Sequence, residues 1–437
     1  MVLGVAANIL LLGYFKYTNF FIDNANALFH GDFHLNAIVL PLAISFFTLQ
    51  QIAYLVDIYR GEVARHSFLD YCLFITFFPK LISGPIVRFN EMMPQITNEL
   101  KPKLTLSNVA VGLAVFFLGL FKKVILADSI GAYANPVFNA AADGVALSFF
   151  NSWSGALSYT LQLYFDFSGY CDMAIGLGLM FGIRLPLNFY SPYRATSTTD
   201  FWRRWHMTLS RFLRDYLYIP LGGNRKGFPR QAINLMIVMV IAGLWHGAGW
   251  TFIVWGALHG LYLVINHSWR RLRSKLGYST EKTTGTGTIV SVLITFIAVT
   301  VAWVFFRADS IGAAAAILQG MVGMNGFVLP SGYHIALGGL EQFLGQIGIT
   351  FGPVIGFSSI PVVWIIVSLI ICWFLPNAQE YMSNYNPAFD RFSEEAKKPL
   401  RCLRWGPSLW GATIIAVITV IAIIGLNQTS AFLYFQF

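Results

Sequence analysis

Long apolar runs constrain this chain more than any other feature of its sequence. A helix that crosses a bilayer needs about 20 mostly apolar residues. Only 11% of the residues are charged and 56% are hydrophobic, whereas soluble domains usually carry about 25% charged residues. The chain therefore has too few charges to coat a soluble surface. The candidate membrane segments are 1–22, 36–58, 107–127, 151–183, 231–246, 250–266, 287–306, 360–375 and 408–426, with shorter or interrupted runs at 68–87 and 311–328.

These runs predict an all-α fold, because a helix satisfies its own backbone hydrogen bonds within lipid. We expect a polytopic integral membrane protein with about 9–11 membrane segments. No internal repeat and no long linker rich in glycine, serine or proline divides the sequence. Residues 1–437 are therefore expected to form a single membrane domain, whose first run is a retained span and not a cleaved signal.

The formal net charge of +9 would suggest a nucleic-acid partner if the protein were soluble. No nucleic-acid-binding pattern accompanies this charge. The basic residues lie in short loops between apolar runs, where Lys and Arg set the orientation of the spans. We therefore expect the lipid bilayer, and no nucleic acid, as the partner that explains the charge.

The basic loops also orient the runs 231–246 and 250–266. Clusters of Arg and Lys precede the first run and follow the second, so both clusters are expected on the cytoplasmic side. The turn at 246–249 then points away from the cytoplasm. A 16-residue arm covers roughly 24 Å, which is less than the ~30 Å hydrocarbon core. His246 is therefore expected deep in the membrane, near the far leaflet.

His246 stands in the stretch GLWHGAGW (243–250), between Trp245 and Trp250. An ionisable residue within a membrane span marks a functional site by default, and imidazole suits proton transfer near neutral pH. The flanking glycines permit close approach of the backbone, and the tryptophans can wall off a cavity. A structural histidine is the alternative. His259, in the middle of the next run, is a weaker candidate for the same cavity.

Residues 199–219 predict an amphipathic helix that lies at the membrane interface. On a helical wheel, aromatic and aliphatic side chains fall on one face and arginines on the other. Thr198 or Thr199 is expected to cap its start. His206 falls on the apolar edge. It is expected either to bond a backbone carbonyl in the core or to face the same cavity as the intramembrane histidine described above.

A polar stripe runs along one apolar segment, where Ser158, Gln162, Asp166 and Tyr170 are spaced by four residues and share one helix face. A carboxylate within a span costs about 2.5–3.5 kcal/mol, so Asp166 must face protein or a wet cavity. A structural hydrogen-bond network and a cavity wall are both open. Asp172 lies away from the centre of this stripe and is expected to pair with a base.

Several familiar chemistries lack their motifs in this chain. It has no G-x-S-x-G elbow, no G-x-x-x-x-G-K-[ST] loop and no HExxH spacing. A serine hydrolase, an ATPase and a metalloprotease are therefore disfavoured, and no metal site is expected. Group transfer between two substrates stays open. Because Arg pairs well with phosphate, Arg203, Arg204 and Arg211 are expected to contact a phosphate-bearing donor.

Long stretches of the chain resemble one known family. The segments DFWRRWHMTLSRFLRDYLYIPLGGNR (200–225), GLWHGAGWTFIVWGALHG (243–260) and LYFDFSGYCDMAIGLGLMFGIRLPLNFYSPY (163–193) resemble the membrane-bound O-acyltransferase family, and its bacterial alginate O-acetylation branch in particular. The paired WHMTLS and LWHG motifs are highly specific, and the resemblance covers nearly the whole chain. Family members usually carry further hydrophobic segments before the first run, so the N-terminus is expected either to be truncated or to have a misassigned start.

The resemblance implies an enzyme that passes an acetyl group across the membrane. The donor, acetyl-CoA or an acyl-carrier protein, would bind from the cytoplasm as a substrate and not as a permanent cofactor. The acceptor would be a hydroxyl of a periplasmic acetyltransferase partner or of an exopolysaccharide such as alginate. The family's invariant histidine matches His246, the expected general base. Its second polar position matches His206, which is expected to hold the donor or to stabilise the developing oxyanion.

The resemblance also implies the bacterial inner membrane and a ring of tilted helices with a thinned centre. A transporter or flippase for a lipid- or polysaccharide-linked substrate is the alternative, although the inverted repeats that it predicts are not visible in the sequence. A scaffold for a secretion complex is a further alternative, in which both histidines would tolerate substitution. The side chains expected to line the cavity around the histidines are Trp205, Trp245, Trp250, Asp166, Gln162 and His259.

Overall fold

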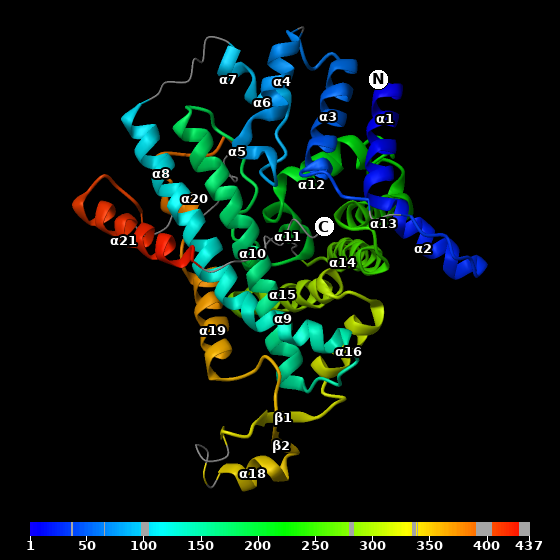
Figure 1. Cartoon of the computed structure of the whole chain (residues 1–437), viewed down its shortest axis with the longest axis vertical. Helices are drawn as coiled ribbons and strands as arrows, with labels where there is room; N and C mark the ends of the chain where they lie inside the picture. The colour runs from blue at the N-terminus through cyan, green and yellow to red at the C-terminus, as the bar shows by residue number, and fades with distance from the viewer. Residues whose placement is uncertain are drawn as a thin grey trace.

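The fold is built around one long helix, α10 (Phe149–Met180), which has 32 residues and is buried along most of its length (Figure 1). It packs against α8, α9, α15, α16 and α19. Buried side chains lie on all faces of α10, as expected for a helix in the centre of a membrane protein. The computed structural model describes residues 1–35, 38–64, 66–97, 105–278, 284–333, 338, 340–389 and 404–427.

A second long segment lies beside α10 and is joined to it by ion pairs. Lys122 pairs with Asp172 at 2.5 Å, and Lys123 pairs with Asp166 at 2.7 Å. The expectation that Asp172 pairs with a base is thereby confirmed. Charges within a span need such partners. The segment consists of α8 (Leu106–Phe121), the π-helical η2 (Lys122–Ala127) and α9 (Asp128–Ala142).

The helices α13 (Gly227–His246) and α14 (Trp250–Lys275) form a hairpin. The predicted turn between them is confirmed, since residues 247–249 alone connect the two helices. The expectation of a short arm is wrong. α13 has 20 residues and α14 has 26, so they rise about 30 Å and about 39 Å. α13 begins earlier than the apolar run because Pro229 fits the first turn of a helix.

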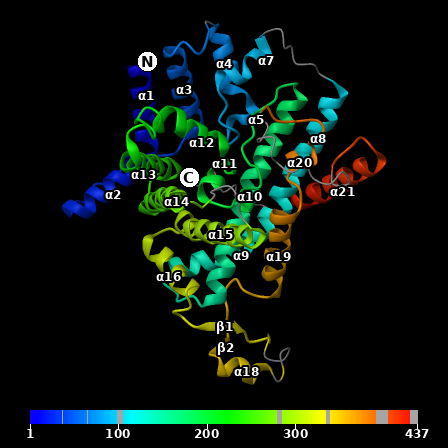
Figure 2. The same cartoon turned by 180° about the vertical axis from the view of Figure 1, so that it is seen from behind.

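The first helical segment runs along the outside of this hairpin. It consists of α1 (Val2–Leu12), the π-helical η1 (Gly13–Tyr17) and α2 (Thr18–Phe29), and α2 lies beside α13 and α14 in both views (Figures 1 and 2). It is followed by α3 (Ile44–Tyr59), which is shorter than the run 36–58, because Ala43 takes the left-handed conformation with φ +63° and the helix begins only after it.

Ten further helices belong to the main helical part of the described structure. α15 packs against α14 and α16, and α21 packs against α8. Their bounds are α4 (Phe68–Thr76), α5 (Phe78–Leu81), α6 (Phe89–Met92), α7 (Pro94–Thr97), η3 (Pro192–Arg194), α15 (Gly285–Arg307), α16 (Ile311–Met321), α19 (Ser359–Phe374), α20 (Ala378–Tyr381) and α21 (Leu409–Gly425).

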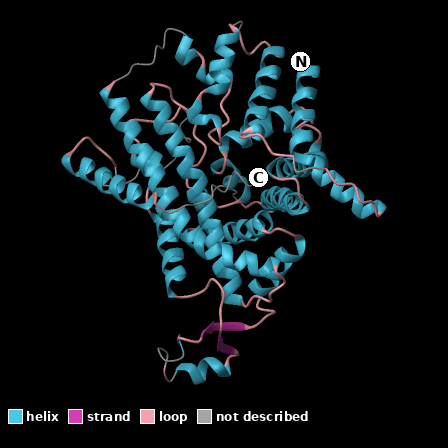
Figure 3. Ribbon diagram, viewed as in Figure 1, coloured by secondary structure: helices cyan, strands magenta, loops and turns pink. Residues whose placement is uncertain are grey.

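One small sheet lies at the end of the molecule opposite α4 and α7 (Figure 3). Its strands β1 (Phe327–Pro330) and β2 (Ile349–Gly352) pair in parallel, and α18 (Leu340–Gln346) lies between them in the chain. The apolar runs of the sequence do not predict this sheet. The apolar run 311–328 is divided between α16 and β1, because the residues after Met321 turn through Gly323 and Gly326.

The all-α polytopic membrane fold is confirmed. Within the described ranges, four helical segments are long and apolar enough to cross a membrane, by length and composition, and α16, α19 and α21 are shorter apolar helices. The total of about 9–11 membrane segments stays a prediction. The four long segments are Val2–Phe29, Leu106–Ala142, Gly227–His246 and Gly285–Arg307.

The amphipathic segment is not the one continuous helix that the wheel assumed. It is divided into α11 (Thr198–Arg204), α12 (Met207–Leu213) and the π-helical η4 (Arg214–Tyr218). The division lies at Trp205 and His206, which both leave the right-handed helical conformation. The expected cap is also wrong: the side chain of Ser197, and not of either threonine, accepts from the backbone N–H of Asp200.

Candidate active site at the His206–His246 pair

His246 is the last residue of α13 and is buried, with 4% of its surface exposed. Its imidazole is surrounded by aromatic rings. The ring centroids of Trp245, Trp255 and Phe306 lie 4.8, 5.0 and 5.1 Å from its own. The short turn after α13 thus holds an ionisable ring inside an aromatic cage, well suited to exclude water.

His206 comes from the break between α11 and α12 and is fully buried. Its ring centroid lies 6.5 Å from that of His246, and Trp245 lies within 6.2 Å of it. The structure therefore brings together the two histidines that the sequence placed 40 positions apart. The backbone of His206, with φ +43° and ψ +53°, is in the left-handed conformation. A non-glycine residue is held there only by strong local contacts, and such strain clusters at functional sites.

The contacts that hold this break come from the loop that follows α10. The backbone N–H of Tyr190 donates to the carbonyl of Arg204 at 2.9 Å, and the N–H of Met207 donates to the carbonyl of Asn188 at 3.0 Å. The carbonyl of Arg204 and the N–H of Met207 thus pair with the loop, whereas the carbonyl of His206 accepts from Ser210 within α12. A helical wheel cannot contain this information, because the partner lies outside the segment.

The side chain of Asn188 fixes the tautomer of His206. Its Oδ1 accepts from the backbone N–H of Thr208 at 3.2 Å and faces Nδ1 of His206 at 3.1 Å. An amide oxygen only accepts, so Nδ1 of His206 carries the proton. Nε2 is then a bare lone pair, buried and without a hydrogen-bond partner among the residues that the structure describes. A neutral His206 can accept a proton at Nε2 but cannot donate one there.

His259 is buried beside the pair but has the opposite tautomer. The indole N–H of Trp202 points at its Nδ1 at 3.3 Å. Because an indole N–H only donates, Nδ1 is the acceptor and Nε2 carries the proton. Trp255 stands between this ring and that of His246, with centroids 4.8 and 5.0 Å away. His259 therefore lies one aromatic ring removed from His246.

Two glycines bring α13 and α14 into backbone contact below the turn. A Cβ atom at Gly243 would meet the carbonyl oxygen of Phe252, and one at Gly256 would meet the carbonyl oxygen of Met239. Small residues allow such close approach between membrane helices. This close packing fixes the position of His246 along the axis of α14.

Two cavities lie close to the histidine pair, but neither is lined by His206 or His246, so the expectation that both histidines face one cavity stays a prediction. One, the arginine cavity, has a volume of about 480 Å³ and is lined by Met207 and Thr208, which directly follow His206. The other, the turn cavity, has a volume of about 360 Å³ and is lined by Gly249 and Trp250, at the turn that follows His246. Further lining residues are Trp202, Arg203, Arg211 and His267 in the arginine cavity, and Asp23, Asn24, Thr251 and Asp309 in the turn cavity.

The three arginines expected to contact a donor differ in their surroundings. Arg203 is exposed and lines the arginine cavity. Arg211 also lines it, but its guanidinium pairs with Glu91 at 2.7 Å. Arg204 pairs with Asp200 at 2.8 Å within α11. Of the three, Arg203 is the one whose charge faces the cavity without a carboxylate partner in the described part of the chain.

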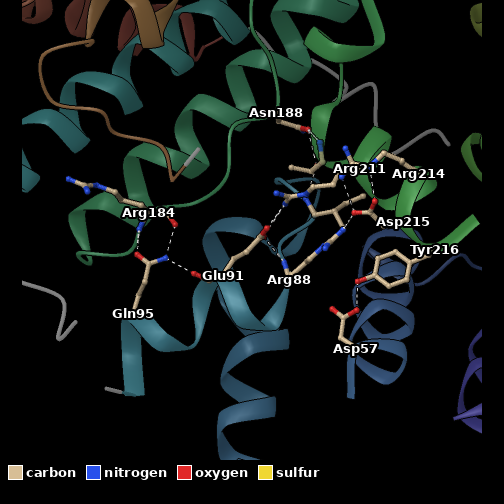
Figure 4. A network of polar contacts seen from close by, with 12 residues as sticks. Asp57, Arg88, Glu91, Gln95, Arg184, Asn188, Arg211, Arg214, Asp215 and Tyr216 are labelled. Atoms are coloured by element: carbon tan, nitrogen blue, oxygen red, sulfur yellow. Dashed lines mark hydrogen bonds and ion pairs between the residues drawn. The ribbon is translucent and has the colours of Figure 1, made fainter. Parts of the chain in front are cut away.

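Arg211 belongs to a polar network that ties the segment after His206 to α3 and α6 (Figure 4). Arg88 and Arg214 both donate to the carboxylate of Asp215, and Tyr216 donates to Asp57 at 2.6 Å. Partial burial raises the pKa of Asp215. The guanidinium groups of Arg214 and Arg88 lower it by more, so the pKa of this carboxyl lies below its ordinary value. The network anchors η4 and, through it, α12.

The remaining predicted cavity residues fall in four places. Trp245 contacts both histidine rings, as described above. Trp205 is buried and stacks on Phe201 with centroids 5.5 Å apart, whereas Trp250 is 56% exposed at the turn cavity. Asp166 pairs with Lys123, and the side chain of Gln162 packs against Gly131 on α9. These contacts favour the structural alternative for the polar stripe.

Two site residues escaped the sequence analysis. Asn188 lies in a loop with no local pattern that marks it. Lys16 donates to the backbone carbonyl of His246 at 3.0 Å, although it stands within the first apolar run. Its charge in that run was a usable signal, because ionisable residues within a span are functional candidates by default.

Comparisons with known proteins agree with this geometry. The profile of the membrane-bound O-acyltransferase family (MBOAT) matches residues 59–307. A peptidoglycan O-acetyltransferase of Helicobacter pylori is 49% identical over 75% of this chain and 66% of its own length. A probable alginate O-acetylase of Pseudomonas putida is 42% identical over 78% of this chain and 68% of its own length.

A more distant relative has a different name. A teichoic acid D-alanyltransferase of Streptococcus thermophilus is 31% identical over 55% of this chain and 60% of its own length. The chain spans about two thirds of the length of the curated relatives it matches. Both histidines and the loop that contacts His206 lie inside the matched residues 59–307. This chain belongs to the membrane-bound O-acyltransferase family.

Proposed function

We propose that this protein is a membrane O-acetyltransferase that passes an acetyl group from a cytoplasmic donor to a hydroxyl on the other side of the membrane. The observation that carries the proposal is the pair of buried imidazoles, 6.5 Å apart, with one cavity beside each. Membership of the acyltransferase family supports the same chemistry. The relatives named after O-acetylation support acetyl as the group transferred.

The donor is acetyl-CoA, and it enters through the arginine cavity. This cavity is lined by Arg203, Arg211, Arg214 and His267, and guanidinium groups pair well with phosphate. Basic loops lie on the cytoplasmic side of bacterial inner membranes, where acetyl-CoA is available. An acyl-carrier protein is the other donor to be tested, and its bulk would keep it outside the cavity.

The acceptor hydroxyl enters through the turn cavity. This cavity lies at the opposite end of α13 from its basic start, so it faces the periplasm when the basic loops face the cytoplasm. The acceptor is a periplasmic acetyltransferase partner or a glycan. The relatives named after peptidoglycan and alginate favour a glycan as the final product.

The transfer needs one base. The imidazole of His246 takes the proton of the acceptor hydroxyl, and the oxygen attacks the thioester carbonyl. The new C–O bond forms, the C–S bond breaks, and the thiolate of CoA takes up the proton from His246. General-base catalysis of this kind contributes about 10²–10⁴-fold to a rate. The aromatic cage keeps water from taking the acetyl group instead.

His206 has a narrower role than oxyanion stabilisation. Its Nδ1 proton is committed to Asn188, and its Nε2 can only accept. It therefore holds the donor by accepting a hydrogen bond from it, and it does not donate to a developing oxyanion. His206→Ala should lower transfer strongly, and a wild-type rate in this variant would leave His206 with a purely structural role.

The test is the acetyl content of the secreted or wall-bound glycan in cells that carry His246→Ala at normal protein level. Loss of acetylation supports the assignment. The control is His34→Ala, since His34 is exposed and pairs only with Asp32 in the described ranges. Undiminished acetylation in His246→Ala would refute the assignment of His246 as the general base.

A further inference from the structure

The end of α13 is held by two side chains from the first helical segment. The ammonium group of Lys16 donates to the backbone carbonyl of Trp245 at 2.5 Å and of His246 at 3.0 Å. The hydroxyl of Tyr17 donates to the carbonyl of Leu244 at 2.5 Å. Three consecutive carbonyls, ending at the expected catalytic base, therefore have donors from a segment more than 220 positions earlier in the chain.

The bonding capacity of Lys16 matches its surroundings. An ammonium group has three donors, and Lys16 has three acceptors, the third being the hydroxyl of Ser45 at 3.2 Å. Within the described part of the chain, Lys16 forms no ion pair with a carboxylate. A charge placed in an apolar helix is unfavourable without partners, so the carbonyls at the end of α13 are what keeps this charge there.

The end of a helix is where such a donor acts most strongly. The last carbonyls of an α-helix have no partner within the helix, and they form the negative end of its dipole, which a cation stabilises. In α13 these carbonyls belong to the residues whose side chains form the site. Fixing the carbonyls fixes the directions in which Trp245 and His246 leave the backbone.

Two further contacts extend the same support to both sides of the turn. The indole N–H of Trp245 donates to the carbonyl of Ser45 at 3.2 Å. The indole N–H of Trp250, at the start of α14, donates to Oδ1 of Asn24 on α2 at 2.8 Å. Residues before and after His246 are thus hydrogen-bonded to α3 and α2.

We propose that Lys16 is a positioning residue for His246: its ammonium group holds the last turn of α13, so that the imidazole keeps its place beside His206. Tyr17 assists by holding the preceding carbonyl. Lys16 does not touch substrate and acts through the backbone of His246. The inference rests on the proposed acetyl transfer, because it assigns a role within that site.

The test compares Lys16→Met, which keeps the aliphatic stem, with Lys16→Arg, which keeps the charge. Both are assayed as the full chain in inverted membrane vesicles that retain the native envelope proteins and hence the acceptor, and CoA release from acetyl-CoA is measured. Because a displacement of about 1 Å can cost 10²-fold in rate, Lys16→Met should lower kcat about 10²-fold. Its KM for acetyl-CoA should stay unchanged, because the arginine cavity is untouched. Lys16→Arg should recover kcat to within about tenfold of wild type.

A second pair of variants covers the case in which Lys16→Met does not fold. Tyr17→Phe removes one hydrogen bond and should lower kcat by about tenfold, the equivalent of one hydrogen bond. Tyr14→Phe is its matched control, because Tyr14 is exposed on the same segment, and it should leave kcat unchanged. Equal kcat in Tyr17→Phe and Tyr14→Phe, or wild-type kcat in Lys16→Met, overturns the proposal.

Amide hydrogen exchange separates this inference from the proposed function. In Lys16→Met, exchange should be faster in residues 243–250, and Lys16→Arg should restore protection. If the wild type turns over no acetyl-CoA, the proposed function fails, while the exchange result still decides whether Lys16 holds the turn. Unchanged exchange in Lys16→Met would refute the inference even if the enzyme is active.

Discussion

Asn188 offers the sharpest test of how the site is built. Its Oδ1 faces two donors that cannot rotate away, the backbone N–H of Thr208 and Nδ1 of His206. Asn188→Leu keeps a similar side-chain volume but leaves both donors unsatisfied. Each buried unsatisfied group costs about 1–3 kcal/mol, so the folded state should lose about 2–6 kcal/mol.

The same change should also impair catalysis beyond its effect on stability. Without Oδ1, nothing in the described contacts keeps the proton of His206 on Nδ1, and the Nε2–H tautomer becomes accessible. That tautomer cannot accept at Nε2. His206 then no longer accepts a hydrogen bond from the donor and no longer holds it in place. Because a misplacement of about 1 Å can cost 10²-fold in rate, kcat of the folded fraction should fall about 10²-fold.

Asn234→Leu is the matched control. Asn234 is also fully buried and donates to the carbonyls of Gly223 and Leu221, far along α13 from the histidines. Both variants should unfold at lower temperature in detergent, but only Asn188→Leu should lower kcat per folded molecule. ¹⁵N shifts of His206 should show a protonated Nδ1 in the wild type and a mixed tautomer in Asn188→Leu. Wild-type kcat and an unchanged tautomer would refute the reasoning.

Three further predictions test other parts of the account. Gly256→Ala should destabilise the α13–α14 hairpin by about 1–3 kcal/mol, seen as a lower thermal midpoint than in Gly285→Ala, where a Cβ meets open space. Arg203→Ala should raise KM for acetyl-CoA about tenfold, or 1.4 kcal/mol, with kcat unchanged; an unchanged KM would remove Arg203 from the donor site. Because the folded pKa of Asp215 is lowered, its ion pairs should stabilise the protein above pH ~4 and lose this effect as pH falls further. The thermal midpoints of wild type and Asp215→Asn should therefore differ at pH 7 and converge below pH ~4; a constant difference would contradict this.

The sequence predicts the helices of this protein well because they depend on local composition. Each of the nine full-length apolar runs corresponds to a helix, and the turn at 247–249 falls where the basic loops required it. The lengths of the helices were less predictable. α13 starts within polar residues that the hydropathy pattern excluded, because a helix continues past the apolar run wherever its first turn finds suitable residues.

The site was only partly predictable, for a physical reason. His246 and His206 stand out as ionisable groups on apolar faces, which is a local signal. The break at His206 depends on backbone pairing with the loop around Asn188, and the support of His246 depends on Lys16, more than 220 positions earlier. Contacts over such separations leave no periodic trace. The small sheet of β1 and β2 escaped for the same reason, since its strands are only four residues each.

The central proposal is that His246 is the general base for transfer of an acetyl group from a cytoplasmic donor to a hydroxyl on the other side of the membrane. Inverted membrane vesicles that retain the native envelope proteins expose the basic loops to the medium, and labelled acetyl-CoA can be added outside. The account predicts that label accumulates on acceptor hydroxyls in the lumen, that CoA is released outside, and that His246→Ala abolishes both. Equal lumenal labelling in wild type and His246→Ala would contradict it.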